Sequence, residues 1–322
     1  MDIEQRVWTA DEGWRTLRAF DAAAAAALVF VFAAPGLLDD GEKWREIAAC
    51  YPGARIIGCS TGGEIVADEV LDGAAVAAAL RFSDATVASA CVELAVYAGD
   101  SRAAGAALAE KLPRDGLKLA FVLADGVQVN GAQLALGMRG VLGEEIALSG
   151  GLAGDGAAFG RTVVGLDAAA PAPGRIAAVG LYGARLTAHC GSFGGWDRFG
   201  PERRITRSVA NVLYEIDGEP ALDLYKRYLG EDAAGLPGSA LLFPLLVRVG
   251  DDGAELVRTI VGIDEAAKTM TFAGDVPEGA SAQLMRGHFD RLIEGAETAA
   301  RQADEAGGSG GEARLALLVS CI

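Results

Sequence analysis

The sequence has few cationic side chains and lacks any long hydrophobic run. Its 322 residues include 28 Lys and Arg against 44 Asp and Glu, a formal net charge of −16. This excess of acid argues against nucleic-acid binding, which needs clustered Lys and Arg, and against anionic membrane surfaces. The most apolar stretch, residues 22–35, is shorter than the ~18–20 residues that span a bilayer. Acidic residues precede it, which does not fit a signal peptide. We therefore expect a cytoplasmic protein without membrane insertion.

Cysteine and histidine are also scarce. The five cysteines are odd in number and widely spread, and no C-x-x-C pair occurs. This pattern indicates neither a zinc site nor a disulfide framework, so we expect free thiols in a reducing compartment. Only two histidines, His189 and His288, are present to serve as a catalytic base or a metal ligand.

What is present is enough apolar sequence, 51% of the residues, for two domains. Two apolar runs, Ala27–Ala33 and Lys118–Ala124, are short enough to be buried strands. Each is followed by a helical stretch, a second apolar run and a glycine-rich segment. We name these segments glycine loop 1, residues 58–63, and glycine loop 2, residues 150–156. Two further apolar runs follow each loop, at 74–80 and 86–94 in the first case and at 175–181 and 185–190 in the second. The order repeats, which predicts an α/β domain with an internal pseudo-repeat over residues 1–200.

The remaining residues, 201–322, read as a second α/β domain with a mixed sheet flanked by helices. The turn Asp217-Gly218 precedes a short helix from Pro220 that Gly230 ends. Further elements are predicted as strands at 241–249 and 256–263 joined across 251–253, a strand at 269–272, a helix from about 281 to 306, and a strand from 314 to 322. We therefore expect an α/β protein of two domains.

A G-x-S-x-G pattern, which exposes a nucleophilic serine between a strand and a helix, occurs in glycine loop 1 at Gly58-Cys59-Ser60-Thr61-Gly62. The expected strand precedes it, but few residues are left for the following helix. A nucleophilic Ser60 is therefore weighed against a structural or ligand-lining loop with small hydroxyls. Glycine loop 2 contains no matching nucleophile, which favours the second interpretation.

Phosphate-binding patterns are absent: there is no GxxxxGK[ST], and Gly154-Asp155-Gly156 lacks the third glycine of a dinucleotide fingerprint. Paired glycine loops still offer backbone N–H groups to a small carboxylate ligand. Tight turns that need positive φ account for them equally well. The ligand-binding candidates of the two loops are Cys59, Ser60, Thr61, Gly62, Gly63, Gly151 and Asp155.

Three further candidates lie between the predicted domains. His189 falls in an alternating run that places it with Arg185 and Thr187 on one face of a strand, either facing solvent or acting as a ligand. Trp196 either packs at the domain junction or forms the wall of a pocket. Arg204 belongs to a basic cluster that is either paired with nearby carboxylates or available to an acidic ligand group.

Residues 191–230, GSFGGWDRFGPERRITRSVANVLYEIDGEPALDLYKRYLG, resemble the junction between the two halves of FIST sensory domains. Other family-like segments are GCSTGGEI from Gly58, LPGSALLFPLLVR from Leu236, LVRTIVGID from Leu256, FAGDVPEGA from Phe272 and LMRGHFDRLIEGA from Leu284. The resemblance covers nearly the whole chain. The junction and the last segment are most similar to the haem-binding, nitric-oxide-sensing FIST proteins.

The resemblance implies a signal-transduction sensor rather than an enzyme. It implies nitric oxide sensing through haem and regulation of a partner such as a histidine kinase or a diguanylate cyclase or phosphodiesterase. Of the residues present, we expect His189 to be the axial ligand, because it lies on the polar face of its predicted strand, just before the glycine- and aromatic-rich segment 191–199, and imidazole binds iron near neutral pH. A FIST sensor of an amino acid or other metabolite without haem, and more distantly a serine hydrolase using Ser60, remain alternatives. FIST proteins continue past residue 322, so the second domain is expected to be C-terminally incomplete, and its apolar end to favour homo-oligomers.

Overall fold

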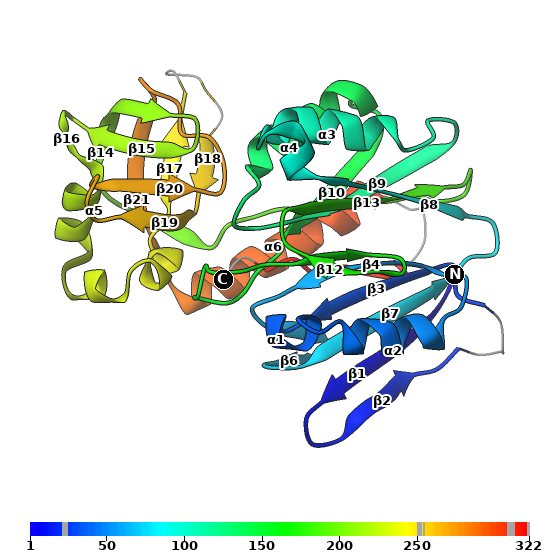
Figure 1. Cartoon of the computed structure of the whole chain (residues 1–322). Coiled ribbons are helices and arrows are strands. Elements are labelled where there is room, and N and C mark those ends of the chain that lie inside the picture. Colours follow the sequence, from blue (N-terminus) through cyan, green and yellow to red (C-terminus); the bar gives the residue numbers. More distant parts are fainter. Residues whose placement is uncertain (21–24, 250–252, 254, 308–312, 321–322) are drawn as a thin grey trace. The chain divides into compact units, whose positions relative to one another are not determined.

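The computed structural model describes residues 1–20, 25–249, 253, 255–307 and 313–320. These residues form two compact units (Figure 1). The first unit contains residues 1–188 and the segment 313–320, and the second contains residues 189–307. Among the described residues, no helix combines the length and the apolar character that crossing a membrane would require.

The first unit is built on two mixed sheets. The larger has the order β12-β11-β4-β3-β7-β1-β2, with β1 Asp2–Thr9, β2 Gly13–Arg18, β3 Leu28–Ala33, β4 Arg55–Ser60, β7 Ala75–Arg81, β11 Val164–Leu166 and β12 Ala169–Ala172. The smaller has the order β10-β9-β13-β8, with β8 Thr86–Glu93, β9 Leu117–Ala124, β10 Ala147–Leu152 and β13 Arg175–Tyr182. A separate hairpin pairs β5, Glu64–Val66, with β6, Glu69–Leu71.

The two sheets face each other, and helices cover their outer faces (Figure 1). Successive side chains of β3 alternate: Leu28 and Phe30 enter the core between the sheets, whereas Val29 packs toward α1, Pro35–Leu38, and α2, Glu42–Cys50. On the opposite side, α3, Ser101–Glu110, and α4, Gly131–Leu142, cover the smaller sheet, and the short helix η1 spans Leu94–Tyr97. Burial on both faces explains why the strands read as continuous apolar runs.

Each sheet contains the same central arrangement. The strand β3 pairs in parallel with β4 and antiparallel with β7, and β9 pairs in parallel with β10 and antiparallel with β13. The predicted mixed α/β class with two domains is therefore confirmed. These strand orders are compatible with the pseudo-repeat, which stays a prediction.

Two strands expected from the sequence are absent from the described chain. Residues 185–190 are irregular, so the prediction of a strand that carries His189 was wrong. Residues 313–320 also form no strand. Instead, Leu315 and Leu317 pack against the core between the two sheets of the first unit. Residues 321–322 of that prediction lie outside the described residues.

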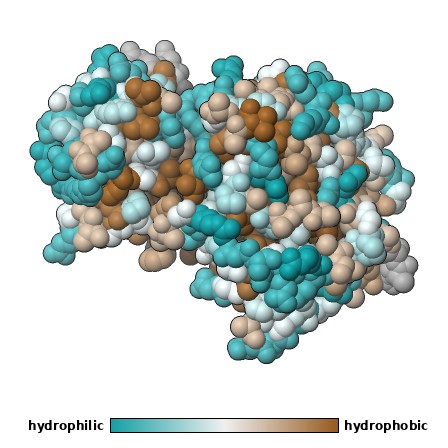
Figure 2. Space-filling model, viewed as in Figure 1, coloured by the Kyte–Doolittle hydropathy of each residue, from teal (hydrophilic) through white to brown (hydrophobic). Residues whose placement is uncertain are grey.

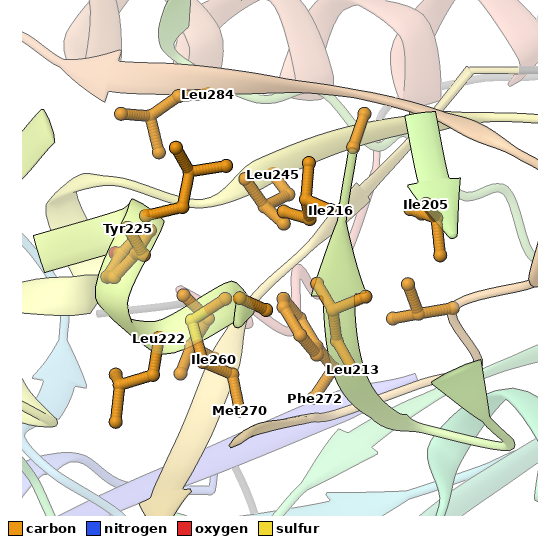
Figure 3. Packing of buried hydrophobic residues seen from close by; sticks show 14 of the residues in the cluster. Ile205, Leu213, Ile216, Leu222, Tyr225, Leu245, Ile260, Met270, Phe272 and Leu284 are labelled. Atoms are coloured by element: carbon orange, nitrogen blue, oxygen red, sulfur yellow. The ribbon is translucent and has the colours of Figure 1, made fainter. Parts of the chain in front are cut away.

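The second unit contains one sheet of the order β18-β17-β21-β14-β15-β20-β19, with β16 beside β15. Its strands are β14 Trp196–Val209, β15 Val212–Ile216, β16 Glu219–Pro220, β17 Leu245–Arg248, β18 Glu255–Arg258, β19 Ile260–Asp264, β20 Thr269–Phe272 and β21 Ser281–Gly287. Its helices are α5 Ala221–Leu229, η2 Gly230–Gly235, η3 Gly238–Leu242 and α6 Phe289–Gly307. The sheet and α5 enclose an apolar core, in which Leu222, Ile260 and Met270 lie (Figure 3).

Most of the elements predicted for this unit are present. Asp217 and Gly218 have φ of 52° and 79° and join β15 to β16, and α5 ends at Gly230 as expected. The strands β17 and β18 pair, while residues 250–252 of their predicted turn lie outside the described residues. The helix predicted from residue 281 was wrong in its first part, because residues 281–287 form β21, which pairs with both β14 and β17.

Candidate functional site

The two glycine loops lie side by side at one end of the first unit. The backbone N–H of Gly154 donates to the carbonyl oxygen of Ser60 at 2.9 Å. The N–H of Thr61 donates to Ala33 at 3.0 Å, and that of Ala153 donates to Ala124 at 2.7 Å. The carboxyl ends of β3, β4, β9 and β10 therefore meet at this end, which is where ligands bind in open α/β sheets.

Ser60 has a structural environment rather than that of a nucleophile. Its side chain is fully buried, and its Oγ accepts the backbone N–H of Val163 at 3.1 Å. The segment that follows the G-x-S-x-G pattern is the strand β5 rather than a helix, so the strand–turn–helix geometry of a nucleophile elbow is not formed. Ser60 instead holds glycine loop 1 to the segment that leads into β11.

Cys59 lies beside Ser60 and faces the core between the two sheets. Burial raises the pKa of its thiol to about 12. Because the thiolate is the form that binds metals and attacks electrophiles, Cys59 is suited to packing rather than to chemistry.

Glu64 is the least expected polar residue of this end: it falls within the family-like segment from Gly58 but was not among the predicted site residues, and its side chain is buried. Its Oε1 accepts the hydroxyl of Thr61 at 2.7 Å, and its Oε2 accepts the backbone N–H of Ala74 at 3.0 Å. Burial raises the pKa of Glu64, and the nearby Asp72 adds to this effect, whereas the two hydrogen bonds oppose it. Glu64 thus ties Thr61 of glycine loop 1 to Ala74, the residue before β7.

We expect Glu64→Ala to lower the free energy of unfolding by about 1–3 kcal/mol, because the buried N–H of Ala74 loses its acceptor. Glu64→Gln keeps an acceptor and removes the buried charge, so its effect should be smaller. The raised pKa in the fold means that the carboxylate costs stability above that pKa. Lowering the pH from 7 toward the ordinary glutamate pKa, ~4.3, should therefore favour wild type over Glu64→Gln. Urea unfolding across this pH range measures both effects, and equal losses in the two variants would contradict the assignment.

Asp155 organises glycine loop 2 with its own carboxylate. Its Oδ1 accepts the N–H of Phe159 at 3.0 Å, and its Oδ2 accepts those of Gly160 and Arg161 at 2.7 and 2.8 Å. Arg161 also forms an ion pair with Asp39 after α1. Asp155 therefore fixes the turn at residues 159–161 that follows glycine loop 2, and what glycine loop 2 offers a ligand is its backbone.

A second buried carboxylate, missed in the sequence, supports this end from the smaller sheet. Asp125 follows β9 and accepts the N–H groups of Val127, Gln128 and Gly174 at 2.7–2.9 Å. The hydroxyl of buried Thr162 accepts the N–H of Gly126 at 2.9 Å. An Asp-Gly pair directly after a buried strand was the available signal.

The ligand-binding candidates of the two glycine loops differ in their exposure to solvent. Thr61, Gly63 and Gly151 are half-buried, and Gly62 is exposed, whereas Cys59 and Ser60 are buried beneath them. Gly151 lies against the segment 313–320, since a methyl group added there would lie 3.1 Å from a methyl carbon of Val319. The accessible part of the site therefore consists of Thr61, Gly62 and Gly63 with the backbone of residues 154–156.

The other three candidates belong to the second unit. His189 is exposed on an irregular segment beside Gly307, at the end of α6. Trp196 is half-buried at the start of β14, with its ring against Gly194. Arg204 is exposed, and its backbone N–H donates to Asp217 at 2.9 Å. Its neighbour Arg203, rather than Arg204, lines a cavity of about 30 Å³ between α5 and the sheet.

These positions do not fit a haem in the second unit. Haem needs a large, mostly apolar pocket and an axial ligand. The cavity beside Arg203 is small and is lined by neither histidine nor cysteine, and His189 and His288 are both exposed. Among the described residues, no cluster of three or more His, Cys, Asp and Glu could hold a metal ion.

Sequence comparison gives two family matches that together cover most of the chain. The profile of the FIST N domain matches residues 27–219, and that of the FIST C domain matches residues 221–322. No curated protein sequence matches the chain.

Proposed function

Because the chain belongs to the FIST family of signal-transduction sensors, we propose that its first unit binds a small ligand at the two glycine loops. One observation carries this proposal: the hydrogen bond from Gly154 to Ser60 joins the two loops at the carboxyl ends of two parallel strand pairs. The exposed backbone of Gly62 and the hydroxyl of Thr61 supply hydrogen-bonding groups there. The family is sensory rather than catalytic, and the burial of the Ser60 hydroxyl argues against a nucleophile at this site.

The ligand class that suits this site is a small polar metabolite such as a free amino acid. Backbone N–H groups of glycine loops bind carboxylates, and the exposed Asp72 has a carboxylate oxygen beside Gly63 of glycine loop 1, 3.7 Å from where a methyl group added at Gly63 would lie. An amino acid carries both a carboxylate and an ammonium group, so it complements a site of backbone donors with an acidic neighbour. Sensor domains pair with signalling enzymes, and we extend the proposal to a histidine kinase or a cyclic-di-GMP enzyme as the partner.

The test is a titration of the full chain with each of the twenty free L-amino acids, followed by NMR of the backbone amides. We expect shifts at residues 60–63 and 153–156. A methyl group added at Gly154 would lie 3.4 Å from the nitrogen of Gly62, so Gly154→Val fills the space between the loops and should abolish these shifts. Gly140→Val, on the exposed face of α4, is the control. No shift in wild type, or the same shifts in Gly154→Val, would refute the proposed site.

Haem-based nitric oxide sensing is the alternative function, and a haemin titration distinguishes it from binding of a metabolite at the glycine loops. The proposal expects no intense Soret band from the wild-type chain. If a Soret band forms and is shifted by His189→Ala but not by His288→Ala, the haem function with His189 as ligand is supported instead. Both histidines are exposed, so both substitutions should leave the fold intact.

A further inference from the structure

One side of the helix α6 is covered by the segment 191–195 of the second unit. A methyl group added at Gly191 would lie 1.8 Å from the carbonyl oxygen of Ala299. One added at Gly195 would lie 2.3 Å from the carbonyl oxygen of Arg291, about two turns earlier in the helix. The two backbones are therefore in direct contact at both points, and this packing holds α6 in place along most of its length.

A second side of α6 is apolar and open to solvent. Phe289 and Ile293, one turn apart, are 85% and 69% exposed. Ala296 and Ala300 continue the row and are also exposed. Spacings of four, three and four residues place these four side chains on one side of the helix. We call them the α6 apolar face.

The regular spacing distinguishes this face from other exposed apolar residues. Single apolar residues are common on protein surfaces, and Figure 2 shows them in separate patches among hydrophilic residues on the visible face of the molecule. The α6 apolar face instead follows the heptad pattern of helices that pair with another helix. The pattern continues through the half-buried Ala303 to Gly307 at the end of α6.

A row of carboxylates borders the α6 apolar face. Asp290, Glu297 and Asp304 are exposed and recur every seven residues, so they lie in line along one edge of the face, which we call the acidic row. At 100° per residue, the segment 191–195 covers the other edge. Within the described part of the chain, none of the three carboxylates forms an ion pair. Arg301, the one cationic residue on this side of α6, donates to the hydroxyl of Thr298 at 3.3 Å.

We propose that the α6 apolar face binds an amphipathic helix of a partner protein, in which Lys or Arg residues border the apolar stripe at heptad spacing. The apolar side chains of that helix contact Phe289 and Ile293 and cover Ala296 and Ala300, whose small size leaves room for larger residues. Its cations lie opposite the acidic row, which sets the orientation of the two helices. This surface extends the sensor function proposed above to its partner, and it does not depend on which ligand the glycine loops bind.

The acidic row argues against the other occupants of such a face. In an antiparallel pair of two copies of α6, the acidic row of one copy would face that of the other, and like charges repel across an interface. In a parallel pair, the row would face the edge that the segment 191–195 covers, where it meets no cation. Helices that lie on membrane surfaces carry Lys and Arg on their polar side, whereas anionic lipids would repel the acidic row.

The experiment titrates the full chain with a fluorescein-labelled synthetic peptide of three heptads, with Leu and Ile at the apolar positions and Lys at the bordering positions. A second peptide has Glu in place of each Lys. Fluorescence anisotropy measures both affinities, and NMR of the backbone amides locates the bound peptide. We expect the Lys peptide to shift amides of residues 289–304 and the Glu peptide to bind about tenfold more weakly or less, because several charge pairs become repulsive.

Glu297→Lys reverses one charge of the acidic row. It should weaken binding of the Lys peptide about fivefold and strengthen that of the Glu peptide by a similar factor. Glu305→Lys is the matched control, because it makes the same change of net charge at an exposed position on the polar side of α6. Its effect on either peptide should be smaller.

Ile293→Ser removes an apolar side chain from the centre of the contact. It should weaken binding of the Lys peptide about ten- to a hundredfold, the loss expected when a buried isoleucine is removed from an interface. Val209→Ser, at the end of β14, replaces another side chain that is 63% exposed and should leave the affinity unchanged. All four substituted side chains are exposed, so the variants should fold, and thermal unfolding verifies this.

Three results would overturn the proposal. Equal effects of Glu297→Lys and Glu305→Lys would mean that the Lys peptide responds only to net charge. Unchanged binding in Ile293→Ser, or amide shifts confined to residues outside α6, would place the peptide elsewhere. Light scattering that shows a dimer of wild type, but a monomer of Ile293→Ser, would assign the face to a second copy. Shifts at residues 60–63 and 153–156 on addition of amino acids test the glycine loops separately.

Discussion

Replacing Trp44 with alanine is expected to lower the free energy of unfolding of the first unit by about 3–5 kcal/mol. Trp44 is almost completely buried between α2 and the larger sheet. A methyl group added at Gly165 of β11 would lie 2.6–2.9 Å from atoms of its ring, so ring and backbone are in direct contact. Its Nε1 also donates to the carbonyl oxygen of Asp167 at 2.9 Å. Alanine would leave a cavity and an unpaired carbonyl group.

Trp14 is the matched control. It is half-buried, and its Nε1 donates to Glu46 at 2.6 Å, so Trp14→Ala removes an aromatic ring and a hydrogen bond without opening a core cavity. Urea unfolding followed by far-ultraviolet circular dichroism measures both variants. Trp44→Phe should lose less than Trp44→Ala, because it retains most of the apolar contact. A loss below about 1 kcal/mol in Trp44→Ala, or one no larger than in Trp14→Ala, would show that α2 contributes little to the unit.

Sequence patterns predicted the buried strands well and the ambiguous segments poorly. The apolar runs at 27–33 and 118–124 correspond to β3 and β9. Continuous apolar segments of about seven residues are typical of strands that are buried on both faces. Residues 281–287 contain good helix formers, yet form β21, since pairing with two neighbouring strands outweighs local propensity. The short strands β11 and β12 were missed because segments of three or four small or apolar residues are too short to show the alternation of polar and apolar side chains that predicts a strand.

The candidate site was predictable only in part, for similar reasons. The repetition of apolar run and glycines drew attention to both loops, and the structure places them side by side. Glu64 and Asp125 could not be identified as buried, because a single carboxylate has no pattern that reports its burial. The cluster containing Arg203 and Arg204 was visible, but the sequence does not show which of the two lines the cavity, because that depends on which face of β14 packs against α5.

Gly150→Ala is expected to have an effect comparable to that of Trp44→Ala, at least about 3 kcal/mol, or to prevent folding of the first unit. Gly150 lies in β10 with φ of 144°, a backbone conformation that residues with a side chain rarely adopt. A methyl group added there would lie 1.8 Å from the carbonyl oxygen of Val122. Because that atom belongs to the backbone of β9, the clash can be relieved only by separating the two parallel strands. Soluble yield and the urea midpoint measure the change.

Gly151→Ala separates this close approach from a general requirement for glycine in the loop. A methyl group at Gly151 would meet only the side chain of Val319, at 3.1 and 3.9 Å, and a side chain can move. Its loss of stability should therefore be small. Hydrogen exchange of the amides of β9 and β10 should speed up in Gly150→Ala and stay unchanged in Gly151→Ala. If both variants were equally stable, β10 would not need Gly150 to pair with β9, and the position of glycine loop 2 beside Ser60 would have to depend on Asp155 and Thr162 instead.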